Sequence, residues 1–317
     1  MYYIYIQYIK HTMPLLSKSE VPAYFKSIRP TLGYTTIKTY SSLVWTLYTS
    51  EFRNAVKLDT DWFPANQDRI VELIKDKPRS TKTSILTAVL VLISNPEQSL
   101  AIQESFKAEK TILNEQYDSG IMTPRQRENW IPYGAMIGMW NEKMRDSKHL
   151  FEKENLNYIE RNALNEFMLM TLCIGRFFPP RRLEWLDMKL RNYNPEKDNW
   201  IDWENNRFVI NVYKTQAKYG TQYVPFNDEC AQLLKRFIAR TDNGSDYLLS
   251  NSKGGRFPAS RGTTMLNSMF GKNVGVDLIR HAYKTYHNPN QRPLGELKKE
   301  AAAMGHSVAT GITYVLR

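Results

Sequence analysis

Hydrophobic residues in the first hundred positions recur with the spacing of an α-helix. In the segment TTIKTYSSLVWTLYTSEF (35–52), Ile37, Val44 and Leu47 fall on one face, behind threonines that are suited to capping the first turn. The same period predicts further helices at 68–76, at 80–95 and, in a longer and more polar form, at 99–120. The first part of the chain is therefore predicted to be helical.

The second half of the chain combines the hydrophobic spacing of helices with the alternation of strands. NALNEFMLMTLCIG (162–175) is apolar enough for a buried helix, and a short helix is expected after Pro179-Pro180. RFVINVY (207–213) alternates in the manner of a strand, and 221–226 is its expected antiparallel partner across the basic loop KTQAKYG. Further helices are predicted at 228–240, 260–270, 276–287 and 294–304. The expected fold class is mainly α with a small antiparallel β-sheet.

A chain of 317 residues exceeds the size at which one hydrophobic core usually suffices, so two domains are expected. Residues 121–158 contain Pro124, Pro132 and Gly134 ahead of a charged amphipathic stretch. We therefore predict a helical domain over 1–145, which includes a linker from about 121, and a mixed α/β domain over 146–317.

The formal net charge of +11 favours a polyanionic partner such as nucleic acid, although a basic protein without that role remains an alternative. Cys173 and Cys230 lack metal-binding spacing, so neither a metal site nor a disulfide framework is expected, and a reducing compartment fits. The opening MYYIYIQYIKH does not resemble a signal peptide, Met13 is an alternative start, and no run is apolar enough for a membrane span.

Two predicted helices begin with hydroxyl side chains and a lysine, TIKTY at 36–40 and STKTS at 80–84. Helix N-termini attract phosphates, which makes Lys38, Arg79 and Lys82 candidate DNA contacts. The alternative is that the serines and threonines only cap their helices.

Four separated segments carry residues that bind or transfer phosphoryl groups. They are PPRRLEWL (179–186), the loop KTQAKYG with Lys214, VDLIRHAYKTY (276–286), and the terminal MGHSVATGITY. Each segment alone is weak evidence for phosphoryl-transfer chemistry, because paired arginines and an RxxE spacing usually belong to a solvated helix face.

In this order the segments resemble the catalytic domain of the tyrosine recombinase (phage integrase) superfamily, of the viral and mobile-element type. The resemblance covers about 160–317, and it implies a helical core-binding domain before a mixed α/β catalytic domain. The residues that match the family's catalytic positions are Arg181, Lys214, Arg280, His306 and Tyr314, with Glu184 matching a buried glutamate that steadies the first arginine.

The resemblance implies a site-specific recombinase or integrase that cleaves and rejoins double-stranded DNA. Tyr314 would attack phosphorus and form a 3′-phosphotyrosyl bond, without metal, cofactor or ATP. The arginines and His306 would hold the phosphate oxygens, and Lys214 would protonate the leaving 5′-oxygen. The family also implies a homotetramer on two recombination sites and an intracellular location with DNA.

Several alternatives stay open. Asp277 stands where the family usually has histidine, so it is either the base for Tyr314 or the cap of a helix that starts at Leu278, and His281 is a second candidate base. Lys218 rivals Lys214, and Arg182 rivals Arg181, although Glu184 three residues after Arg181 favours the latter. The competing functions are a type IB topoisomerase and a catalytically impaired DNA-binding protein.

Overall fold

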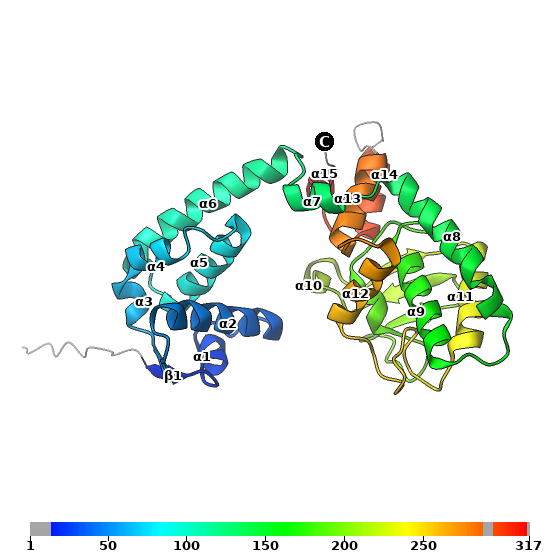
Figure 1. Ribbon diagram of the computed structural model, residues 1–317, viewed down its shortest axis with the longest axis horizontal. Helices are drawn as coiled ribbons and strands as arrows, with labels where there is room; N and C mark the ends of the chain where they lie inside the picture. The colour runs from blue at the N-terminus through cyan, green and yellow to red at the C-terminus, as the bar shows by residue number, and fades with distance from the viewer. Residues whose placement is uncertain (1–13, 288–293, 316–317) are drawn as a thin grey trace, which may run out of the picture. The chain divides into compact units, whose positions relative to one another are not determined.

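A computed structural model describes residues 14–287 and 294–315. The opening segment lies outside these ranges. The expectations that it is not a signal peptide and that Met13 is an alternative start therefore concern residues that the structure does not describe. The chain divides into two compact units, Met1–Ser119 and Gly120–Arg317. Figure 1 shows the elements of each unit.

The first unit is a small helical domain with one two-stranded antiparallel sheet, β1 paired with β2. Helix α5 packs against both α2 and α6, and apolar side chains such as Val44, Leu86 and Val89 are fully buried between them. The elements are β1 (Leu15–Ser17), α1 (Val21–Ile28), α2 (Tyr34–Glu51), β2 (Lys57–Asp59), α3 (Trp62–Ala65), α4 (Gln67–Leu73), α5 (Arg79–Ile93), η1 (Pro96–Gln98) and α6 (Leu100–Asp118). The helices predicted from periodicity are thus confirmed in this unit.

The second unit combines helices with a four-stranded sheet in the order β3-β4-β5-β6. The helical elements are α7 (Pro124–Asn129), α8 (Tyr133–Glu152), α9 (Tyr158–Cys173), η2 (Leu183–Asp187), α10 (Gln216–Tyr219), α11 (Asp228–Thr241), α12 (Ala259–Phe270), α13 (Val276–His287), α14 (Leu294–Ala303) and α15 (Val308–Ile312). The strands are β3 (Met188–Lys189), β4 (Asn199–Asp202), β5 (Arg207–Ile210) and β6 (Gln222–Pro225).

Strands β4, β5 and β6 are antiparallel, and the short β3 adds to β4 in parallel. Phe208 pairs with Val224 and Ile210 with Gln222, which confirms the predicted hairpin. Strand β5 ends at Ile210, not at 213 as predicted, so the loop with Lys214 is longer than the alternation indicated. The expected fold class, mainly α with a small antiparallel sheet, is confirmed.

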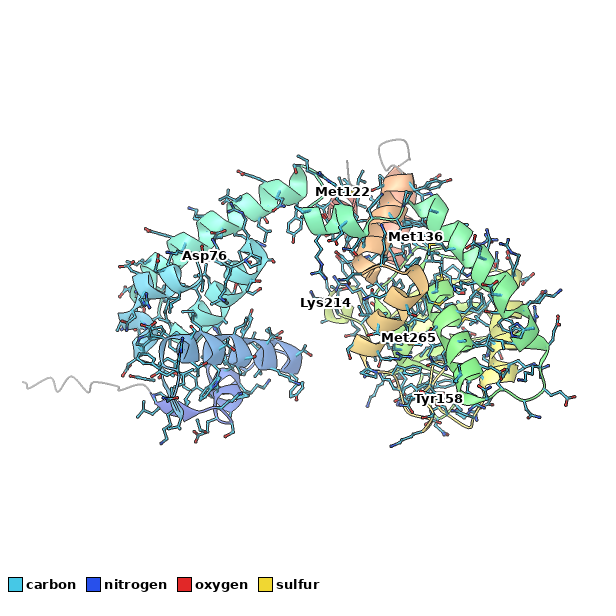
Figure 2. All side chains as sticks on the ribbon, viewed as in Figure 1. Asp76, Met122, Met136, Tyr158, Lys214 and Met265 are labelled. Carbon is cyan, nitrogen blue, oxygen red and sulfur yellow. The ribbon has the colours of Figure 1, made fainter. Side chains whose placement is uncertain are left out.

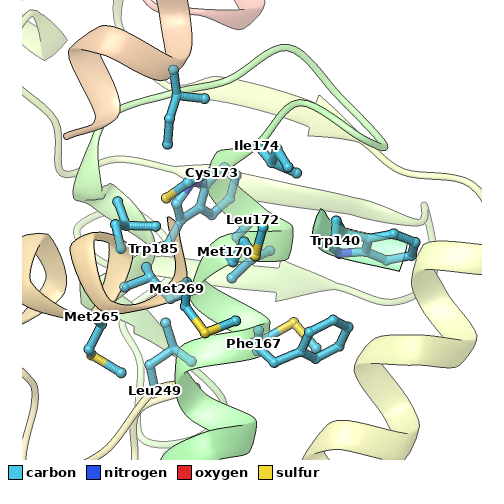
Figure 3. Packing of buried hydrophobic residues seen from close by; sticks show 14 of the residues in the cluster. Trp140, Phe167, Met170, Leu172, Cys173, Ile174, Trp185, Leu249, Met265 and Met269 are labelled. Carbon is cyan, nitrogen blue, oxygen red and sulfur yellow. The ribbon is translucent and has the colours of Figure 1, made fainter. Parts of the chain in front are cut away.

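Helix α9 lies at the centre of the second core. Its C-terminal half is buried, as its continuous apolar run predicts, and it packs against α8, α11 and α12. Figure 3 shows Phe167 and Met170 of this helix among Trp140, Trp185 and Met269, which come from other elements. This core fixes the elements that surround the site described below.

The domain boundary expected near residue 145 is wrong. Helix α8 runs through that position and buries Met136, Trp140 and Leu150 against the rest of the second unit. Its charged residues lie on the opposite face, and they made the stretch resemble a linker in the sequence. The division lies between Ser119 and Gly120, at the end of α6.

No helix in the described ranges has both the length and the apolar character that crossing a bilayer requires. Cys173 and Cys230 are both buried as free thiols.

Candidate active site

A cavity of about 260 Å³ in the second unit brings together four of the residues selected from the sequence, Lys214, Arg280, His306 and Tyr314. These residues come from the β5–β6 loop, from α13, and from the segment around α15. The remaining lining residues are Arg182, Glu184, Tyr213, Thr215, Lys218, Tyr219, Met304, Gly305, Ser307 and Thr310.

The adjacent arginines after Pro180 take different positions. Arg182 has extended backbone (φ −76°, ψ −162°), its side chain is exposed, and it lines the cavity. Arg181 is fully buried behind the cavity wall, where its Nη1 donates a hydrogen bond to the carbonyl oxygen of Ala303. The sequence favoured Arg181, whereas the arginine on the cavity surface is Arg182.

Arg181 is nevertheless poorly compensated. Its Nη2 lies 4.0 Å from Oε1 of Glu184, and neither Nε nor Nη2 has a hydrogen-bond partner among the described residues. Burial lowers the pKa of Arg181, because a guanidinium loses hydration there. Gly305 has φ of +70°, and a Cβ added to it would lie 3.2 Å from Arg181 Nη2, so glycine suits this position. Buried donors of this kind are suited to an anionic group.

Arg280 and Tyr314 are stacked against each other. The Cζ atom of Arg280 lies 4.3 Å from the centroid of the Tyr314 ring, and Nε of Arg280 has no hydrogen-bond partner in the described part of the chain. Tyr314 is 8% exposed. Burial raises the pKa of its phenol, while the cationic Arg280 and Arg182 oppose that shift. Two guanidinium groups, of Arg280 and Arg182, therefore lie near enough to the phenol to affect its pKa.

His306 is held in one tautomer. Its Nδ1 lies 2.8 Å from the carbonyl oxygen of Ser307, so Nδ1 carries the proton. Its Nε2 is buried without a partner within the described ranges, and the ring centroid lies 5.5 Å from that of Tyr314. Burial, then the charges of Arg280 and Lys284, lower the pKa of His306 to about 4. Neutral His306 therefore presents a lone pair at Nε2. It can donate a hydrogen bond from Nε2 to a phosphate oxygen, as the sequence led us to expect, only when Nε2 is protonated as well.

This shift predicts a pH-dependent stability. The pKa of His306 falls from 6.5 to about 4 on folding, so the unfolded chain binds the extra proton between these pH values. The free energy of unfolding should fall by on the order of 2–3 kcal/mol from pH 7 to pH 4. Urea unfolding of wild type and His306→Asn, which keeps a donor for Ser307, measures the difference. Parallel pH profiles for the two proteins would show that His306 is not held neutral.

The lysine loop is tied to the histidine segment. Thr215 Oγ1 donates a hydrogen bond of 3.0 Å to the carbonyl oxygen of Gly305, directly before His306. Lys214 and Lys218 are both exposed and both line the cavity. Figure 2 labels Lys214 beside α10, within the β5–β6 loop. The geometry thus brings either lysine to the cavity, and the choice between them stays open.

Asp277 lies in the first turn of α13, which begins at Val276, so the expectation that Asp277 caps a helix starting at Leu278 is wrong. His281, whose Nε2 lies 3.7 Å away, and the nearby Arg280 lower the pKa of Asp277. Asp277 is not among the residues that line the cavity, whereas His306 lines it together with Tyr314. Asp277 is therefore less well placed than His306 to act as a base.

A buried ion pair that no sequence pattern predicted lies next to the site. Lys284 Nζ lies 2.6 Å from Glu300 Oε2, both side chains are almost fully buried, and the pair links α13 to α14. A Cβ on Gly311 would lie 3.0 Å from His306 Cε1 and 3.6 Å from Lys284 Cε, so these groups are closely packed. Lys284 is one turn after Arg280, and that spacing was the available signal.

The candidate DNA contacts of the first unit differ in environment. Helices α2 and α5 begin after Gly33 and Pro78 without side-chain caps, so the capping alternative is wrong for both. Lys38 is exposed and lines a cavity of about 710 Å³ beside α1 and α2. Arg79 and Lys82 both pair with Glu109 of α6, at 3.1 Å and 3.0 Å, which reduces the charge they present to a phosphate.

No group of three histidine, cysteine, aspartate or glutamate side chains suited to a metal ion occurs in the described ranges. Comparison with known proteins finds no matching family model and no matching curated protein. Among solved structures, the chain is similar to "Crystal structure of XerA recombinase", with 14% identity, a TM-score of 0.40, and coverage of 95% of this chain and 94% of the other. At these values the similarity shows neither the family nor the activity of this chain.

Proposed function

We propose that this protein is a DNA strand transferase that cleaves and rejoins DNA through a covalent bond to Tyr314. The observation that carries the proposal is the single cavity that gathers a phenol, a cationic lysine loop, a histidine lone pair and the guanidinium groups around them. Lys214, Arg280 and the pair of His306 and Tyr314 come from three segments that are far apart in the sequence, so no local helix or loop requirement explains why the three segments meet.

The arginines would bind the phosphate. A phosphodiester in the transition state concentrates charge on its non-bridging oxygens, and planar, permanently charged guanidinium groups stabilise that charge. Arg182 and Arg280 face the cavity, and Arg181 lies behind it with free N–H groups. Arg181 is thus proposed to donate to the phosphate from within the cavity wall. Arg182 would share with it the role that the family resemblance assigned to Arg181 alone.

The proposed reaction exchanges one phosphodiester for another. The Tyr314 phenol loses its proton to Nε2 of His306, its oxygen bonds to phosphorus, and the bond from phosphorus to the 5′-oxygen breaks. Lys214, or Lys218 of the same loop, donates a proton to that leaving oxygen. The 3′-phosphotyrosyl bond preserves the energy of the broken bond, so another 5′-hydroxyl can reverse the step without ATP.

The partner is proposed to be double-stranded DNA, in keeping with the net charge of +11. Site-specific recombination or integration, within a homotetramer on two sites, is the finer role implied by the family resemblance of the sequence. That role would place the protein inside a cell with DNA, in the service of a viral or mobile element. A type IB topoisomerase would share the chemistry but would relax supercoils without exchanging sites.

One observation favours a second candidate, a DNA-binding protein without catalysis. Tyr314 is buried, and burial raises the pKa of its phenol, which opposes attack by this oxygen. Binding of a phosphate would have to reorient the ring for the transferase proposal to hold.

A library of nicked duplexes tests the proposal. Each duplex carries random sequence on both sides of a fixed nick, so cleavage near the nick releases a short 5′-hydroxyl strand and traps the protein on DNA. The transferase is expected to form complexes that survive denaturing detergent, and recovering their DNA identifies the site. Duplex binding without any such complex would favour the non-catalytic candidate.

A further inference from the structure

The proposed chemistry leaves one buried histidine unused. His281 follows Arg280 on α13, is 5% exposed, and has its Nδ1 2.9 Å from the main-chain oxygen of Tyr314. Because a carbonyl only accepts hydrogen bonds, Nδ1 carries the proton and donates it. The imidazole also packs edge-on against the Tyr314 ring, with centroids 4.9 Å apart.

The other nitrogen of His281 faces Asp277. Nε2 lies 3.7 Å from Asp277 Oδ2, four residues earlier on the same face of α13. This separation is longer than a good hydrogen bond, and the carboxylate attracts the ring only when Nε2 carries a proton as well as Nδ1. Asp277 therefore acts on the imidazolium form of His281, through charge. Asp277, His281 and the main chain of Tyr314 therefore form a continuous row of contacts.

We propose that His281, oriented by Asp277, is a positioning residue that fixes the main chain of Tyr314 against α13. The inference rests on the proposed function of Tyr314 as the nucleophile. It assigns Asp277 a role through His281, and not the direct role of base that its place in the sequence suggested. Neither residue needs to touch the DNA for this role.

The segment that carries Tyr314 needs such an anchor. Helix α15 spans only Val308–Ile312 and contains Gly311, and Gly305 comes directly before His306. The main-chain N–H of Tyr314 makes a long bond of 3.3 Å to Gly311, within the same segment. The bond from His281 ties this main chain to a different element, which also carries Arg280. Misplacing an attacking oxygen by about 1 Å costs on the order of 100-fold in rate.

Three variants separate anchoring from general stability. His281→Phe keeps an aromatic ring but removes the donor, and it should slow formation of the covalent complex by roughly 100-fold with duplex binding unchanged. His281→Asn offers an amide N–H near the position of Nδ1 and should recover most of that loss. Asp277→Asn should slow the reaction less, and combining it with His281→Phe should cause no further loss.

Hydrogen exchange of residues 308–315 supplies a readout without DNA. The amides of this segment should exchange faster in His281→Phe than in wild type or in His281→Asn, with thermal melting as the check on folding. Unchanged exchange in His281→Phe would overturn the anchoring role. Additive losses in the double variant would overturn the role of Asp277 through His281. If wild type forms no covalent complex while exchange responds as expected, the proposed function fails and the anchor stands.

Discussion

Replacing Tyr314 by phenylalanine is expected to abolish covalent attachment to DNA completely and to leave duplex binding within about twofold. The phenol oxygen is the only atom removed, so the ring still packs against Arg280 and His281. Phosphate binding depends on the arginines and lysines, which this change does not touch. Denaturing gels of labelled DNA measure attachment, and a gel shift under native conditions measures binding.

The matched control is Tyr286→Phe. Tyr286 is an exposed tyrosine on α13, outside the lining of the cavity, and its loss should leave attachment at the wild-type rate. If Tyr314→Phe retains attachment, another side chain is the nucleophile and the proposed mechanism is wrong.

The second large effect concerns Arg280. Changing it to alanine should slow attachment by on the order of 100- to 1000-fold, because a preorganised donor to the phosphate and the cation against the Tyr314 ring are lost together. Arg280→Lys should recover only part of the rate, since an ammonium cannot bind two oxygens in the planar, two-pronged manner of a guanidinium. Single-turnover rates at saturating protein separate this loss from weaker binding.

Arg191→Ala is the matched control for Arg280→Ala. The Arg191 side chain is 40% exposed, and its ion pair with Asp242 lies on the surface at 2.6 Å, where such pairs contribute little. Its removal takes away the same charge from the same unit and should leave the single-turnover rate unchanged. Equal losses for both arginines would indicate an effect of net charge, and the proposed clamp would be contradicted.

The long helices were predictable because each has to bury one apolar face, and that requirement leaves a periodic pattern. Helix α8 was not, because Pro132 and Gly134 at its start and many charged residues on its outer face resemble a linker. Short elements such as β3 and β4 depend on pairing with neighbouring strands and are too short to leave a pattern of their own. Tertiary contacts, not local preference, determine them.

The candidate site shows the same limit. The family resemblance of the sequence selected Lys214, Arg280, His306 and Tyr314, and in the structure these four residues line one cavity. Spacing alone could not decide which of the adjacent residues Arg181 and Arg182 reaches that cavity, because neighbouring side chains in extended backbone point in opposite directions. The contact of His281 with Tyr314 spans two elements, so no local pattern reveals it.

The most direct test of the account is the chemical identity of the protein–DNA bond. Covalent complex from the nicked-duplex library is digested with nuclease and protease, and mass spectrometry locates the nucleotide on the peptide. The expected product is a nucleotide joined through its 3′-phosphate to Tyr314. Attachment through a 5′-phosphate, or to any other residue, would contradict the proposed mechanism.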